Sequence, residues 1–217
     1  SGSGAVTLSG GGVALIYYNP TSYTAPTDYS GYVSGGTVTA FMLVNNLTQL
    51  QAMNTNLTGS YALGRDIDAG ATATWNYDGA IYQGFSPIGS ATASGSQFRG
   101  KFNGAGHTIT GLTINRPTQW YVGLFGVLGN GAAVTNVRLA DVNITGFYNV
   151  GGLAGAAYLL GSAESVLISN VAVSGAVSCP QSNAGGLVGQ ALNGMLITDS
   201  SSSATVSGIG SGYPQYF

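Results

Sequence analysis

Three copies of a Gly-Leu-x-Gly tetrad constrain the fold of this chain more than any other feature. They begin at Gly123, Gly152 and Gly186, which are 29 and 34 residues apart. Each tetrad is followed by a polar spacer, an amide or acid, and a short alternating strand that ends in glycine. Repeats of this length are typical of solenoids, propellers and arrays. The pattern therefore predicts that one short unit stacks on its own copies.

The segments between the glycines alternate in the manner of β-strands. Val137-Arg138-Leu139 and Val171-Ala172-Val173 each place apolar side chains on one face. Each interior glycine penalises a helix by about 1 kcal/mol, which disfavours a helical repeat. Short strands buried on one side suit coils that stack about 4.8 Å apart. The sequence thus predicts an all-β parallel β-solenoid, whereas a propeller needs longer units of about 40–50 residues.

The tetrads and the polar position after them define the predicted structural repeat. We expect the tetrad glycines at corners, where a positive φ or close contact between coils excludes a Cβ. The tetrad leucines should stack inside the solenoid, and the amides and acid should bond along the stack or cap turns. The repeat residues are Gly123, Leu124, Gly126, Gly152, Leu153, Gly155, Gly186, Leu187, Gly189, Asn136, Asn170 and Asp199.

We predict a single solenoid over residues 1–217. Residues 1–40 are expected to form less regular coils with a Tyr/Pro-rich loop. Residues 41–97 should form further coils with a short helix, and residues 98–208 the regular stack. An aromatic tail, residues 209–217, follows.

One helix signal stands in the chain. Thr48 is a candidate N-cap, and Leu47, Leu50 and Met53 have helical spacing. The sequence predicts a short helix at Thr48–Asn54 that lies against the rod. In this prediction the helix is not at an end of the stack, so both ends keep unpaired strand edges.

Aromatic residues gather in two segments. Tyr17–Tyr32 holds five tyrosines, and its two prolines exclude a central strand. The rings either pack against the solenoid wall or form an exposed platform for sugars or another subunit. The candidate interaction residues are Tyr17, Tyr18, Tyr23, Tyr29, Tyr32, Tyr213, Tyr216 and Phe217. Chain ends are usually disordered unless they are tied down. We therefore expect both ends of this chain to contact either an identical subunit, head to tail, or more of the same chain.

Charge and composition exclude several classes of partner. Five Lys and Arg stand against seven Asp and Glu, and the cations are scattered, so nucleic acid is not an expected partner. No apolar run reaches the roughly 20 residues that a membrane-spanning helix needs. The single cysteine, Cys179, allows no internal disulfide and is interpreted as a core residue. No cofactor is expected.

The order of motifs along the chain resembles a known family. The tetrads are similar to the GLUG motif of bacterial surface proteins. Leu43–Asn54, Tyr61–Ala69, Gly84–Gly89 and Phe98–Ile109 resemble the segments that precede such repeats in filamentous-haemagglutinin-like, two-partner-secreted exoproteins. The resemblance covers residues 41–208. It implies a right-handed parallel β-helix rod that is exported through an outer-membrane secretion partner.

Titratable residues offer little catalytic chemistry. Asp66 and Asp68 share one face of a strand, which suits half of an acid pair or a weak Ca²⁺ site. Structural capping is the preferred interpretation. The only histidine, His107, lacks the neighbours of a zinc site and is interpreted as a turn residue. The sequence therefore predicts a protein that is not an enzyme.

The predicted function is an extracellular structural or adhesive rod, secreted or at the cell surface, that associates end to end or forms part of a longer fibre. Surface glycans or host matrix components are candidate partners. The alternatives are a carbohydrate-active β-helix enzyme, acting as a polysaccharide lyase or hydrolase, and an ice-binding protein with Thr-x-Thr arrays. Asn46, Asn56 and Asn143 begin N-x-[ST] sequons and are candidate glycosylation sites.

Overall fold

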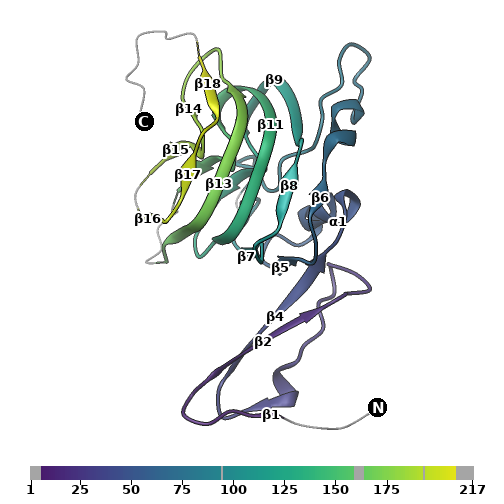
Figure 1. The fold of residues 1–217 in the computed structure, drawn as a ribbon, viewed down its shortest axis with the longest axis vertical. Coiled ribbons are helices and arrows are strands. Elements are labelled where there is room, and N and C mark those ends of the chain that lie inside the picture. Colours follow the sequence, from purple (N-terminus) through teal and green to yellow (C-terminus); the bar gives the residue numbers. More distant parts are fainter. Residues whose placement is uncertain (1–5, 94, 159–163, 193, 209–217) are drawn as a thin grey trace.

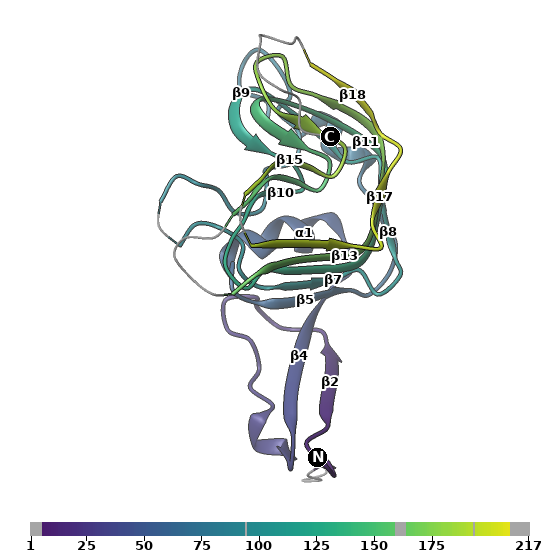
Figure 2. The ribbon, with the colours of Figure 1, turned by 90° about the vertical axis from the view of Figure 1, so that its left-hand side faces the viewer.

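The structure, a computed structural model, describes residues 6–93, 95–158, 164–192 and 194–208 (Figure 1). These residues form a parallel β-solenoid of about six turns, as predicted, with a ribbon of strands projecting from one end. Seen along the stack, each regular coil has four walls around one apolar interior (Figure 2).

The first wall runs through the whole molecule. Its strands are parallel and lie in this order: β2 (Val13–Tyr18), β4 (Thr37–Val44), β5 (Ser60–Leu63), β7 (Lys101–Asn103), β11 (Ala133–Gly151), β13 (Val166–Ser178) and β16 (Met195–Thr198). Among the described residues, the edge strands of this wall are therefore β2 and β16.

The other walls use later parts of the same coils. The second wall contains β6 (Ile67–Asp68), β8 (Thr108–Thr110), the middle of β11 and β13, and β17 (Ser201–Ser202). The third contains β9 (Thr113–Val122), the ends of β11 and β13, β14 (Ala184–Gly185) and β18 (Thr205–Ser207). The fourth is the three-stranded sheet of β10 (Phe125–Leu128), β12 (Ala154–Ala157) and β15 (Val188–Ala191).

Left-handed backbone turns the chain from one wall to the next. Asn136, Asn170 and Asp199 have φ values of 55°, 54° and 51° and stand at the corner between the first and second walls. Asp141, at 54°, precedes the third wall. Asn and Asp tolerate this conformation because their short polar side chains bond locally. The predicted equivalent positions are thus the corners of three successive coils.

The tetrad glycines have a different role. None of the six has a positive φ, so the first of the two reasons expected for them does not apply. The second reason does: a Cβ on Gly123 would lie 2.7 Å from the Gly151 carbonyl oxygen and 2.9 Å from the Ala154 Cα. A Cβ on Gly155 would meet the backbone of Tyr121 and Val122. These glycines let neighbouring backbone segments approach closely.

Matching side chains stack inside the solenoid. On the first wall Tyr61 pairs with Phe102, Phe102 with Val134, and Val134 with Ile168, and all four are fully buried. The tetrad leucines also stack: Leu124 and Leu153 are fully buried, and Leu187, in the last coil, is partly buried against the same core. One continuous core therefore joins the described coils.

Helix α1 (Leu47–Ala52) continues into the 3₁₀ helix η2 (Met53–Thr55). Its N-cap is Asn46, whose side chain accepts a hydrogen bond from the Gln49 amide at 2.9 Å. The predicted cap, Thr48, lies inside the helix, so that assignment is wrong. Asn46 has the extended backbone of an N-cap, φ −159° and ψ 171°, and asparagine ranks above threonine at this position.

The helix closes one end of the stack. Figure 2 looks from the side of β16 to β18, and α1 crosses the coil at the far end. Leu50 and Met53 are fully buried there, and the side chains of Gln51 and Asn54 bond the backbone at Ser86 and Gly89 of a following turn. The expectation that the helix lies away from both ends is wrong, because it covers the N-terminal end of the core.

Before the helix the chain forms a ribbon and not a closed coil. β4 leaves the first wall and pairs with β2 below the solenoid (Figure 1), from Val13 opposite Thr37 to Tyr18 opposite Met42. β1 (Val6–Thr7) pairs with β3 (Val33–Ser34) beyond it, next to the 3₁₀ helix η1 (Ser30–Tyr32). We call β1 to β3 and the first half of β4 the ribbon; it replaces the coils expected over residues 1–40.

A second excursion follows β6. The chain makes the 3₁₀ helix η3 (Gly70–Thr74) and then residues 75–84, whose two arms pair antiparallel at Tyr77 and Tyr82. We call residues 75–84 the side hairpin. Gly84 also pairs antiparallel with Ile114, which anchors the side hairpin to β9 at the edge of the third wall.

Candidate binding surfaces

The tyrosines near the ribbon divide between packing and exposure. Tyr23 is buried, meets Tyr61 edge to face at 5.2 Å, and donates to the Leu43 carbonyl at 2.7 Å. Its burial raises the pKa of the hydroxyl to about 12. Tyr18 and Tyr29 also meet edge to face. The wall-packing alternative therefore describes Tyr23.

The exposed-platform alternative describes two other rings. Tyr17 stacks on Phe41 with 5.4 Å between centroids and stays 45% exposed, and Tyr32 is 56% exposed. The remaining candidates, Tyr213, Tyr216 and Phe217, lie outside the described residues.

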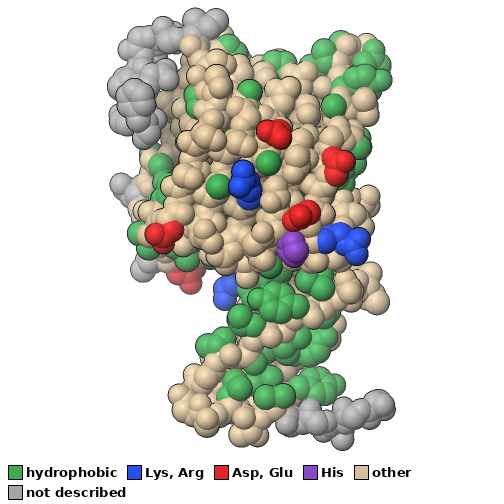
Figure 3. Space-filling model, in the orientation of Figure 1, with side chains coloured by type: hydrophobic (Ala, Val, Ile, Leu, Met, Phe, Trp, Pro, Cys, Tyr) green, Lys and Arg blue, Asp and Glu red, His purple; other side chains and the backbone are tan. Residues whose placement is uncertain are grey.

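Apolar side chains gather at the two edges of the first wall. Val13, Leu15 and Tyr17 are exposed on one face of β2, and hydrophobic side chains cover much of the ribbon in Figure 3. At the opposite edge, the last coil surrounds an apolar pocket of about 940 Å³, whose lining includes Leu187 and Ile197. Ile197 belongs to the interior row of the first wall but is 39% exposed. Both surfaces expose side chains of the kind that the coils bury.

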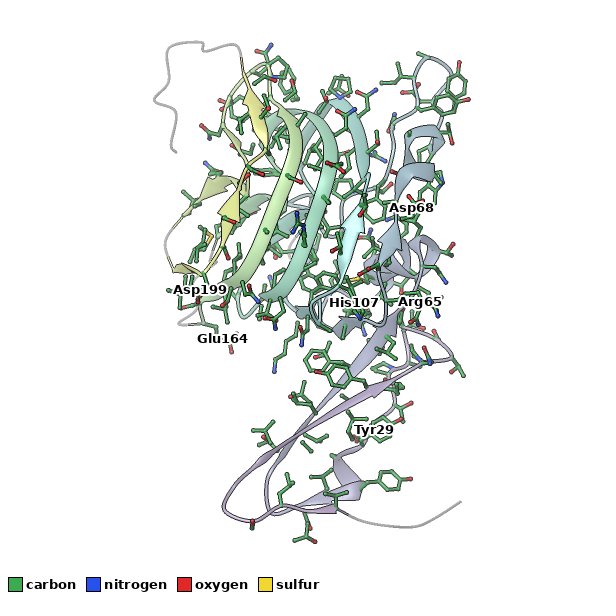
Figure 4. All side chains as sticks on the ribbon, in the orientation of Figure 1. Tyr29, Arg65, Asp68, His107, Glu164 and Asp199 are labelled. Atoms are coloured by element: carbon green, nitrogen blue, oxygen red, sulfur yellow. The ribbon has the colours of Figure 1, made fainter. Side chains whose placement is uncertain are left out.

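The predicted carboxylates cap turns. Asp66 accepts from the Thr108 amide at 2.9 Å and contacts Nδ1 of His107 at 3.2 Å. The Thr108 amide, then the His107 side chain, lowers the pKa of Asp66. Asp68 accepts from the Gly70 amide at 2.9 Å. His107 and Asp68 lie on one side of the solenoid, whereas Asp199 and Glu164 lie toward its C-terminal end (Figure 4).

The charged residues form no metal site within the described ranges. No group of three or more His, Cys, Asp or Glu is arranged to hold a metal ion in that part of the chain. Cys179 is fully buried. Of the Thr-x-Thr pairs, Thr108 and Thr110 lie on the second wall, but their neighbours in β11 are Arg138 and Ala140, which do not extend a threonine array.

The three sequon asparagines differ in how their side chains are used. The side chain of Asn46 caps α1. Asn56 donates its amide to the Tyr23 carbonyl at 3.0 Å and accepts from Thr58. Asn143 is exposed on the third wall. Its side chain makes no hydrogen bond with any other described residue, whereas its backbone amide donates to the Leu112 carbonyl.

A polar groove lies between the third wall and the side hairpin. Its volume is about 480 Å³, and its lining residues are Ala73, Ile81, Tyr82, Thr113, Asn115, Asn143 and Thr145. The floor is two rows of paired residues from successive coils: Thr113 beside Asn143, and Asn115 beside Thr145. Tyr82, which is 47% exposed, forms part of the wall. Sequence reasoning missed this groove, although the alternation Thr113-Ile114-Asn115 indicates a polar outward face.

Asp78 holds the side hairpin in shape. One of its carboxylate oxygens accepts from the amides of Ala80 and Ile81, both at 2.9 Å, and the other accepts from Nε2 of Gln83 at 2.7 Å. These bonds, with the Ile81 amide foremost, lower the pKa of Asp78 to about 2. The Tyr77 ring lies 4.9 Å from the Tyr82 ring. The wall of the groove is therefore built on a rigid turn.

A further aromatic cluster stands farther along the third-wall strands. Trp120 stacks on Tyr148 at 4.6 Å and 17°, with Phe147 beside it, and is 51% exposed. Sequence reasoning did not single out these rings, which lie in neighbouring coils and meet only when the coils stack.

The fold and surfaces define a protein class before any comparison: a parallel β-solenoid with mostly uncharged outer walls. The chain belongs to the family of the M26 IgA1-specific metallo-endopeptidase N-terminal region, whose model matches residues 27–175, more than half of the chain. The word peptidase in that description refers to the proteins that carry this region. A zinc-binding H-E-x-x-H motif needs two histidines, and this sequence has one.

Two relatives carry descriptive names. The chain is 36% identical over 181 residues to halomucin of Haloquadratum walsbyi, an alignment that covers 81% of this chain and 2% of halomucin. It is 44% identical over 62 residues to a putative Gly-rich membrane protein of Evansella cellulosilytica, covering 29% of this chain and 7% of that protein. The chain thus spans a small part of each. No solved structure matches it. Among the described residues, no helix has the length and apolarity to span a bilayer.

Proposed function

We propose that this chain is a structural and adhesive rod segment, secreted or at the cell surface, that associates end to end with copies of itself. The names of the relatives, a mucin-like name and a Gly-rich membrane protein, support a place at the cell surface. A stack of mostly uncharged coils supports a structural role. Membership of the GLUG-type exoproteins, and export through their outer-membrane partner, are parts of the same proposal.

One observation carries the end-to-end association. In the part of the chain that the structure describes, the first wall ends in two edges without a further strand, β2 and β16, which belong to one all-parallel sheet. If β2 of a second copy pairs with β16, the sheet continues in the same direction. Ile197, now half-exposed in the interior row, would then have Ile16 or Tyr18 of the next copy beside it. Further coils of a longer chain could pair with β16 in the same way.

The test is to express residues 1–217 and follow their assembly by light scattering and electron microscopy. We expect oligomers or filaments that dissociate in Ile197→Lys, because a charge at this edge opposes strand addition. Thr110→Lys, an exposed change on the second wall, is the matched control and should leave assembly unchanged. A monodisperse monomer at high concentration would contradict end-to-end association.

Adhesion would depend on many weak contacts. Repeated rods present the same uncharged surface several times, so multivalency strengthens contacts that are weak singly. Surface glycans or matrix components are the proposed partners.

A further inference from the structure

We propose that the groove between the side hairpin and the third wall binds a neutral saccharide. This site extends the adhesive part of the proposed function and is independent of end-to-end association. The volume of about 480 Å³ lies within the roughly 300–1,000 Å³ usual for ligand sites.

The groove combines one aromatic wall with a floor of hydroxyls and amides. A sugar ring has an apolar face of C–H groups and a rim of hydroxyls. The Tyr82 ring can cover the apolar face. Thr113 and Asn143 can meet the rim, since hydroxyls and amides both donate and accept hydrogen bonds.

Three of the four polar side chains of the floor are free to bind, whereas the fourth, Asn115, donates its side-chain amide to the Tyr82 carbonyl at 3.4 Å. Elsewhere in the solenoid, stacked asparagine side chains hydrogen-bond to one another: Asn170 donates to Asn136 at 2.9 Å, and Asn136 donates to Asn103 at 3.2 Å. The side chains of Thr113, Asn143 and Thr145, by contrast, make no hydrogen bond with other described residues. A ligand would therefore gain these bonds without breaking existing ones.

The charges around the groove indicate a neutral ligand. All seven lining residues are uncharged. Of the charged residues close to the lining along the chain, Asp78 is engaged by the side hairpin, and Arg116 by Gln83 and Ser86, at 3.0 and 2.8 Å. The third, Asp141, stands two residues before Asn143 and carries a negative charge, which does not favour an acidic ligand. A nucleotide would also stack on Tyr82, but its phosphates require cations that the lining does not supply.

Backbone hydrogen bonds hold the groove in shape. The backbone amide of Thr113 donates to Oγ1 of Thr72, and the amide of Asn115 to the Gln83 carbonyl, both at 2.9 Å. These bonds hold η3, just before the side hairpin, and Gln83, near the end of the side hairpin, against β9. A preformed site loses little conformational entropy on binding, so weak individual contacts suffice.

The experiment measures binding of purified residues 1–217 to neutral hexasaccharides (cellohexaose, xylohexaose, maltohexaose) and to oligogalacturonate as the acidic comparator, by calorimetry and by NMR titration. We expect at least one neutral hexasaccharide to bind and the acidic one to bind more weakly. Tyr82→Ala should weaken binding roughly tenfold, because it removes the stacking surface. Tyr82→Phe keeps the ring and should retain most of the affinity.

The controls separate this groove from the other exposed rings. Tyr32→Ala on the ribbon and Trp120→Ala on the third wall remove rings that are at least as exposed as Tyr82, and both should leave binding unchanged. Asn143→Ala should weaken binding several-fold while the unfolding midpoint stays near wild type. Binding lost in Trp120→Ala but kept in Tyr82→Ala, or no binding of any neutral hexasaccharide, would overturn the proposal. If the protein is a monomer but binds saccharide, end-to-end association is rejected and the saccharide site stands.

Discussion

The ribbon and the regular coils use similar strand sequences with different results. Both alternate Val, Ile, Leu and Thr, and both pair their strands in parallel. In the coils each inner strand has a neighbour on both edges and buries one face. In the ribbon β2 has one neighbour and exposes Val13, Leu15 and Tyr17. Alternation thus identifies a strand but does not decide whether the strand closes into a coil.

The corner that follows the strand also differs between the two regions. In the coils a left-handed Asn136, Asn170 or Asp199 turns the chain onto the second wall. After β2 the corresponding step is Asn19-Pro20. A residue before proline is pushed toward extended backbone, so Asn19 is poorly suited to such a corner. The chain instead passes the end of the core, where Tyr23 is buried, and then returns along the ribbon to β3.

The largest expected effect is in the core of the coils. Phe102 is fully buried and contacts Phe125 edge to face at 5.7 Å. Phe102→Ala should lower the free energy of unfolding by about 3–5 kcal/mol, through lost burial and a cavity. Ile16→Ala, on the partly exposed β2, should cost less than about 1 kcal/mol. Urea unfolding measures both; equal losses would mean that the ribbon is as well packed as the coils.

The next effect concerns glycines in the two regions. Gly155→Ala should destabilise by about 1–3 kcal/mol, because its Cβ meets the backbone of Tyr121 and Val122. Gly31→Ala in the ribbon is the matched control, since a Cβ there has nothing within 4 Å and its φ is not positive. Its stability should be unchanged or raised by up to about 1 kcal/mol. Thermal melts of the two variants with equal midpoints would argue against close packing of the tetrads.

Corner asparagines should give a smaller effect. Asn136→Ala removes two side-chain hydrogen bonds, to Asn103 and Asn170, and places alanine at a φ of 55°. We expect a loss of about 1–2 kcal/mol, and a smaller one for Asn136→Gly, which removes the bonds but tolerates the angle. Asn19→Ala breaks one exposed bond, to Asn45, and should change stability by less than about 0.5 kcal/mol. Equal losses in Asn136→Ala and Asn136→Gly would show that the backbone angle contributes nothing.

The sequence predicted what repeats and missed what depends on contact between distant segments. The three tetrads and the polar position after them were enough for the solenoid and for the stacked Leu124 and Leu153. The N-cap was misplaced by two residues, because Asn46 and Thr48 are both good caps and backbone geometry decides between them. The groove joins Tyr82 to Asn143 across coils, which no local pattern indicates.

The smallest expected effect is a pH dependence that separates long-range from local carboxylate bonds. Asp66 bonds the Thr108 amide, 42 residues away, whereas Asp28 in the ribbon bonds the Ser30 amide, two residues away. These amides, the largest cause in each case, lower the pKa of both carboxyls below the ordinary 3.8. With a lowered pKa in the folded state, the unfolded chain binds more protons in acid, so the stabilisation is present above pH about 4 and is lost as the pH falls through the folded pKa.

Asp66→Asn should therefore be less stable than wild type at pH 6, and this gap in stability should narrow toward pH 3. Asp28→Asn should show a smaller gap, because its bond can form locally without the coils. Urea midpoints at pH 3, 4, 5 and 6 measure both; a gap for Asp66→Asn that stays constant to pH 3 would contradict the assignment of the Asp66 carboxylate as a coil-to-coil acceptor.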